Sequence, residues 1–285
     1  MMTTQTKVLI GESGAVTGDL SKMFTGQILG QANNRLYRQH RVYTQRISLL
    51  PSTGATLAAP IKVYALSTKW PVMGALRAAR AVYERAMKEE RALHGTSRWH
   101  DFRISCDSVA NTLSAFGQSR SSPPAMAATA LDQGEYDQSS IVCEDGNTRI
   151  FTTELSTGAT QYNVFEEFEE MGSTSSSPSN PESGGYEQAF PGMDDTNAAN
   201  LLQQGNLPPY SEDNDPRFGT WVEVAQLYRD VSGHVLSTGF FEAPLGLILV
   251  KGYTPTTDTP FLLLEAKAGK YKGVDSTDIP AAKMG

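Results

Sequence analysis

The chain has 285 residues, a length that can bury a large hydrophobic core without disulfides or a structural metal. Its two cysteines, Cys106 and Cys143, exclude a disulfide-rich scaffold, and no apolar run reaches the roughly 18 residues of a membrane-spanning helix. We therefore expect a soluble protein that folds in a reducing cytoplasm and has no membrane partner.

Charge divides the chain into two parts. Residues 1–120 hold 16 Lys and Arg against 7 Asp and Glu, a net charge of +9, whereas residues 121–285 hold 8 against 24, a net charge of −16. One interpretation is an ordinary globular surface with uneven charge. The other is a protein whose basic face meets a polyanion while its acidic face meets solvent or a basic neighbouring subunit.

Residues 1–40 are predicted to form an N-terminal arm. Their first part is rich in Thr, Gly, Gln and Asn, and its single helical stripe is interrupted by Gly26 and Gly30. We expect this arm to contain a short helix that packs on another part of the protein.

A run of alternating basic and aromatic residues occupies positions 35–46. Arginine offers forked donors to phosphate, and tyrosine can stack on an unpaired base, so this segment is the candidate nucleic-acid contact. The alternative is the ordinary edge of a strand, because residues 41–50 alternate apolar and polar side chains. The candidate residues that would face nucleic acid are Arg35, Arg38, Arg41, Arg46, Tyr37 and Tyr43.

Residues 41–270 are predicted to form a β domain with one long inserted helix, 71–93. In the helix, apolar residues recur every three or four positions, Pro71 suits the first turn, and Gly95 suits the end. Strands are expected at 41–50, 61–69 and 99–106, on both sides of the Asp145-Gly146 turn, at 162–168, and in three apolar runs after residue 219. A long loop, 172–215, interrupts the domain, and residues 271–285 are expected to form a C-terminal tail.

The sequence lacks the spacing of common catalytic and metal motifs. The Gly-rich stretch after Gly11 has no phosphate-loop lysine, the segment around Ser13 lacks the last glycine of a nucleophile elbow, and the histidines show no metal-ligand spacing. We predict that the chain is not an enzyme and binds no cofactor. A calcium site between subunits at the acidic positions 166–170 stays open beside the simpler interpretation of a solvated acidic rim.

A polar arm, alternating strands, one long helix between early strands, long irregular excursions and no catalytic set together resemble the jelly-roll capsid proteins of small icosahedral viruses and phages. The resemblance covers residues 40–270 as an arrangement of elements. It implies an antiparallel β-sandwich, a closed icosahedral shell built from copies of the chain, and a virion protein made in the host cytoplasm. The segment 35–46 would then face the packaged nucleic acid. One departure is that residues 1–34 hold only two basic residues, Lys7 and Lys22, where many capsid proteins have an Arg-rich tail.

Two other functions fit the same pattern. A carbohydrate-active enzyme or carbohydrate-binding module on a β-sandwich would use Trp70, Trp99 or Trp221 as a sugar platform, with acids such as Glu166 and Glu223 as general acid and base. A phage structural component outside the shell, such as a tail or spike protein, would share the architecture but not the particle.

Overall fold

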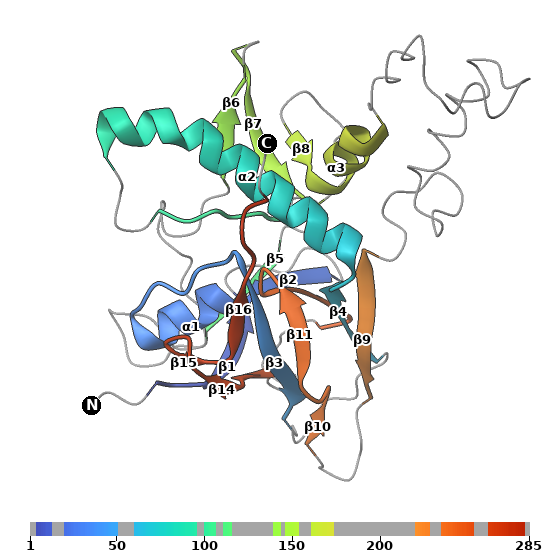
Figure 1. Cartoon of the computed structure of the whole chain (residues 1–285). Helices are drawn as coiled ribbons and strands as arrows, with labels where there is room; N and C mark the ends of the chain where they lie inside the picture. Colours follow the sequence, from blue (N-terminus) through green and yellow to red (C-terminus); the bar gives the residue numbers. More distant parts are fainter. Residues whose placement is uncertain are drawn as a thin grey trace, which may run out of the picture.

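The fold is mainly β, with three helices in the described part of the chain (Figure 1). A computed structural model gives the structure of residues 4–12, 20–50, 60–95, 100–106, 111–115, 139–143, 146–153, 161–173, 220–228, 235–253 and 262–282. None of the helices in these residues is both long enough and apolar enough to cross a membrane. The predicted loop 172–215 lies almost wholly outside the described residues.

Eleven strands form one large sheet, with the order β10-β3-β13-β1-β5-β2-β12-β4-β9 and with β11 and β16 also paired to β3. All pairs in it are antiparallel except β2 with β5. The strands are β1 (Lys7–Glu12), β2 (Leu20–Phe24), β3 (Arg41–Leu49), β4 (Ile61–Leu66), β5 (Asn111–Ala115), β9 (Trp221–Leu227), β10 (Leu236–Ser237), β11 (Phe241–Pro244), β12 (Leu247–Lys251), β13 (Leu262–Ala266) and β16 (Ser276–Asp278).

The main hydrophobic core draws side chains from most strands of the large sheet. Strands from both ends of the pairing order contribute to this core, including Ile47 of β3 and Leu227 of β9. The alternation that the sequence shows at 41–50 has this cause, because every second side chain of β3 points into the core. Helix α1 (Thr25–Asn33) adds Ile28 and Leu29, both fully buried, to the same core.

Strand β3 is hydrogen-bonded along both of its edges. On one edge β13 pairs with residues 45–49 and β16 continues along residues 41–43; on the other edge lie β10 and β11. The nine residues between β13 and β16 leave the sheet as a small hairpin of β14 (Ala268–Gly269) and β15 (Gly273–Val274). The pairing of β3 therefore fixes where this hairpin emerges.

Helix α2 (Trp70–His94) confirms the predicted long helix, with Pro71 in its first turn. It covers a second core to which Leu76, Tyr83, Phe102 and Phe151 contribute. Figure 1 shows α2 across one end of the large sheet, beside α3 (Val164–Ser173) and a small sheet. That sheet consists of β6 (Ser140–Val142), β7 (Thr148–Thr152) and β8 (Gln161–Asn163), and its β6–β7 pair confirms the predicted hairpin.

Two predicted strands are wrong. Residues 100–106 are extended but form only one isolated bridge, Ser105 with Thr152, because the backbone of this segment bonds instead to groups such as Gln39 and Ser139. At 162–168, only the first two residues belong to a strand. Asn163 accepts a hydrogen bond from the backbone N–H of Phe165 at 3.1 Å and so starts α3, whose first turn carries two glutamates where the helix dipole favours negative charge.

The predicted arm and tail are also part of the folded body. Strands β1 and β2 lie inside the large sheet, with Ile10 and Met23 fully buried, because each is paired on both sides. Towards the other terminus, β16 pairs with β3, and Ile279 is buried in the second core beneath α2. Figure 1 shows this segment rising from the sheet to the helix.

The turn between β11 and β12 packs closely against Thr25 of α1 and Tyr43 of β3. Leu245 and Gly246 both have φ of 60°, and a Cβ on Gly246 would lie 3.0 Å from Thr25 Cβ and from Tyr43 Cδ2. We predict that Gly246→Ala lowers the free energy of unfolding, measured by urea denaturation, by about 2 kcal/mol or more, from backbone strain plus this contact. Gly239, with φ of 73° and nothing within 4 Å, supplies the control: Gly239→Ala bears the backbone strain alone. Equal losses in the two variants would contradict the packing described here.

Candidate nucleic-acid interface

Neither predicted tyrosine is available to a base. Tyr37 and Tyr43 are fully buried. The Tyr37 hydroxyl donates to the backbone carbonyl of Lys272 at 3.0 Å, and the Tyr43 hydroxyl donates to the carbonyl of Arg38 at 2.5 Å. Their assignment as residues that stack on nucleic acid is therefore wrong in this fold, because both rings form part of the main core.

Arg46 is held apart from the other arginines of the segment. Its guanidinium donates twice to Glu265 Oε2, from Nε at 2.9 Å and from Nη2 at 2.6 Å. Glu265 lies directly opposite Arg46 in the β3–β13 ladder, and Lys7 approaches the same carboxylate at 3.6 Å. We conclude that Arg46 forms a cross-strand ion pair with Glu265.

Arg41 is fixed at the end of β3. Its Nε donates to Ser276 Oγ at 2.7 Å, its Nη2 donates to the Ser276 carbonyl at 2.9 Å, and its Nη1 lies 3.5 Å from Asp278. The guanidinium carbon stands 3.8 Å from the centre of the Tyr271 ring. Arg41 therefore ties β3 to the C-terminal hairpin and keeps a cation beside Tyr271.

Arg35 and Arg38 lie in the loop before β3 and are more exposed. The Arg38 side chain is 43% exposed; its Nη1 donates to the His100 carbonyl at 3.1 Å and lies 3.8 Å from Asp101. Arg35 is exposed, and among the described residues no carboxylate lies within ion-pair distance of it. Arg35 and Arg38 are therefore the predicted residues whose side chains are most accessible, and their contact with nucleic acid stays a prediction.

The structure adds Lys272, which the sequence analysis did not select. Lys272 and Gly273 form the tip of the β14–β15 hairpin with φ of 51° and 92°, and Tyr271 and Val274 exchange both backbone hydrogen bonds across it. A glycine suits the positive φ at position 273, but nothing in the sequence places this turn beside residues 35–41. We call Arg35, Arg38, Arg41 and Lys272 the cationic cluster.

The charges of the cationic cluster act on one another. Partial burial lowers the pKa of the Lys272 ammonium below its usual 10.5, and Arg38 and Arg35 lower the pKa further by like-charge repulsion. The Lys272 ammonium donates to the Leu36 carbonyl and lies 5.4 Å from the centre of the Tyr271 ring. These cations are thus close enough to repel measurably.

Among the described residues, each acid near the cationic cluster interacts with several donors. Asp101, whose side chain is fully buried, has His40 Nδ1 at 2.7 Å and accepts from the Gln39 N–H at 2.7 Å as well as facing Arg38. Asp278 lies 3.5 Å from His40 Nε2 and 3.4 Å from Arg80, which also pairs with Glu84. Among the described residues, Arg38, Arg41 and Arg80 therefore share three carboxylates, while Arg35 and Lys272 pair with none, so the described cations outnumber the described acids here.

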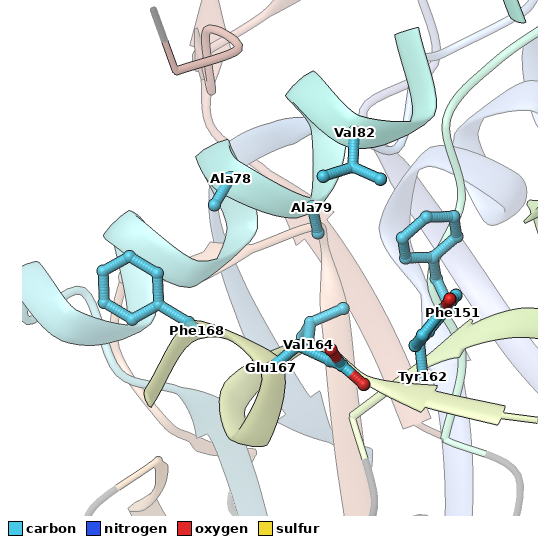
Figure 2. A pocket seen from close by; sticks show the side chains of 8 residues that line it. All are labelled: Ala78, Ala79, Val82, Phe151, Tyr162, Val164, Glu167 and Phe168. Atoms are coloured by element: carbon cyan, nitrogen blue, oxygen red, sulfur yellow. The ribbon is translucent and has the colours of Figure 1, made fainter. Parts of the chain in front are cut away.

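A cavity of about 150 Å³ lies between α2 and α3 (Figure 2). Ala78, Ala79 and Val82 of the helix face Phe151 and Phe168 across it, so the lining is mostly apolar. Among the described residues that line it, Glu167 is the one carboxylate, so these residues supply no pair of carboxylates for acid–base work.

Among the residues of the carbohydrate alternative, Trp221 and Glu223 lie two positions apart on β9, whereas Glu166 belongs to α3. Trp70 is 63% exposed at the start of α2, and Trp221 begins β9, while Trp99 lies outside the described residues. Glu223 accepts a hydrogen bond from Gln226, which holds the pKa of this carboxyl below its usual value. Glu223 is therefore better suited to act as a charged carboxylate than as a general acid. No group of three or more metal-ligating side chains occurs among the described residues.

Comparison with models of protein families, with curated proteins and with solved structures finds no match to this chain. The function must therefore be argued from the geometry.

His100, next to Asp101, provides a pH test of this region. Its ring stacks on Tyr83 with centroids 5.7 Å apart, and burial, followed by the charge of Arg91, lowers the pKa of His100 below its usual 6.5. The unfolded chain then binds a proton more readily than the folded protein, so stability is complete above about pH 6.5 and falls as pH decreases through the folded pKa. We expect His100→Gln to lose less unfolding free energy than the wild type between about pH 7.5 and pH 5.5. Equal losses in the two proteins, measured by urea denaturation, would contradict the lowered pKa.

Proposed function

We propose that this chain is a viral structural protein that self-assembles into a capsid shell enclosing nucleic acid, and that it resides in the virion. The observation that carries the proposal is the cationic cluster, whose members outnumber the carboxylates beside them in the described part of the chain. A surface of this kind attracts a polyanion without reading its sequence. The packaged genome is the polyanion that such a shell would meet.

An unpaired strand edge supports the proposal that copies of the chain contact one another. Strand β9 ends the pairing order of the large sheet, and its outer edge has no partner strand in the described part. Val222 on this strand is 42% exposed, Tyr228 just after it is 60% exposed, and Trp70 is 63% exposed. Unpaired backbone groups beside exposed apolar side chains favour pairing with another chain, and symmetry multiplies such contacts in a shell.

A jelly-roll-like arrangement of the β domain is part of the same proposal. Its support is a mainly antiparallel sheet of eleven strands, most of which contribute to the main core, with a long helix inserted between β4 and β5. In a sandwich, inward-facing side chains of two layers meet in one core in the same way.

Purification of the full chain followed by electron microscopy tests the shell proposal. We expect closed particles of uniform size that contain nucleic acid, detected as a high ratio of absorbance at about 260 to 280 nm. Persistent monomers would contradict the proposal and favour the carbohydrate alternative, and tubes or spikes would indicate a structural component outside the shell.

The role of the cationic cluster is tested by a triple variant, Arg35→Gln, Arg38→Gln and Lys272→Gln. Because these side chains lie at the surface, the particles should still form, but with less than half of the wild-type nucleic acid. The matched control replaces three exposed cations elsewhere, Arg85, Lys88 and Lys251, by Gln. Nucleic-acid content that is the same in the two triple variants would remove the interior role of the cluster.

A further inference from the structure

We propose that Arg35, Arg38 and Lys272 form a binding site for a phosphate group of the nucleic-acid backbone, completed by the hydroxyl of Tyr271. This inference rests on the proposed function and specifies the chemical group that the cluster binds. It assigns the contact to two separate segments, the loop before β3 and the C-terminal hairpin, rather than to the continuous run 35–46.

The hairpin holds Lys272 in a defined position. The backbone carbonyl of Lys272 accepts hydrogen bonds from the Tyr37 hydroxyl at 3.0 Å and from Thr4 Oγ1 at 3.3 Å. Gly273 lies so close to Thr4 that a Cβ on it would approach Thr4 Oγ1 to 2.5 Å. Tyr37 is therefore a positioning residue: fully buried, it anchors the hairpin through the Lys272 carbonyl.

Donor groups remain for a ligand around Lys272. The ammonium gives one hydrogen bond to the Leu36 carbonyl, and an ammonium has three protons to donate. The Tyr271 hydroxyl accepts the Arg38 backbone N–H at 3.1 Å, so its own proton can be donated. Arg38 donates from Nη1 to the His100 carbonyl, and this bond orients the guanidinium. The bond uses only one of the N–H groups of the guanidinium.

The electrostatics favour an anion over an aromatic base. Arg41 already stands over the Tyr271 ring at 3.8 Å, so the cluster offers charge and hydrogen-bond donors rather than a bare ring. Arg35 and Lys272 have no carboxylate within ion-pair distance in the described part of the chain. A bound phosphate would offset the mutual repulsion of these cations, and the contact would be independent of base sequence.

Binding of fluorescent single-stranded oligo(dT), about 20 nucleotides long, to the full chain tests the site. We expect Lys272→Gln to bind severalfold more weakly at low salt, with a slope of log K against log salt that is smaller by about 0.7, the value for one lost phosphate contact on a single strand. Lys272→Arg should retain the affinity, and Tyr37→Phe should weaken binding because the hairpin loses an anchor. The control is Lys251→Gln, at an exposed position in β12, which should leave binding unchanged.

Equal affinity and equal salt slope for Lys272→Gln and Lys251→Gln would overturn the site. Inorganic phosphate is added as a separate arm: if it binds at the cluster while oligo(dT) does not, the assignment to nucleic acid is also overturned. Shell formation is not needed for either measurement. If the chain binds the oligonucleotide but forms no particles, only the shell proposal is contradicted. If particles form and Lys272→Gln binds as well as the wild type, only this site is contradicted.

Discussion

The pairing of β3 along both edges is the constraint on which the rest of the structure depends. On one edge, β13 and β16 follow each other along β3, and the residues between them leave the sheet as a hairpin. The backbone hydrogen bonds from Lys267 N–H to the Thr44 carbonyl and from Thr44 N–H to the Asp275 carbonyl close this excursion on the strand at 2.9 and 3.1 Å. The register of β3 thus brings Lys272 to the loop that precedes the same strand.

That register has an electrostatic consequence. Cations that are more than 200 residues apart in the chain share one surface, and Asp101 and Asp278, the acids beside them, are each engaged by several donors. Buried Tyr37 and the ion-paired Arg46 support the framework, while Arg35, Arg38 and Lys272 stay accessible to a partner. The same sheet leaves β9 unpaired on its outer edge in the described part, so one architecture combines a group of clustered cations with an unpaired strand edge.

Local sequence patterns were sufficient to predict some of the elements but not others. The long helix, β3, β4 and the β6–β7 hairpin follow from periodicity and turn residues, which act within a few positions. The burial of Tyr37, the pairing of Arg46 with Glu265 and the arrival of Lys272 depend on long-range strand register, which a single sequence does not reveal. The segment at 162–168 shows a local conflict, since its alternating residues also fit the helical spacing that Asn163 initiates.

The pKa of the Lys272 ammonium tests the central claim most directly, because it reports whether the hairpin and the loop before β3 share one charged surface. Measured by NMR titration of the labelled side chain, this pKa should lie below 10.5 in the wild type and should rise in Arg38→Gln, where a neighbouring positive charge is removed. A pKa at the usual value that does not respond to Arg38→Gln would contradict the account.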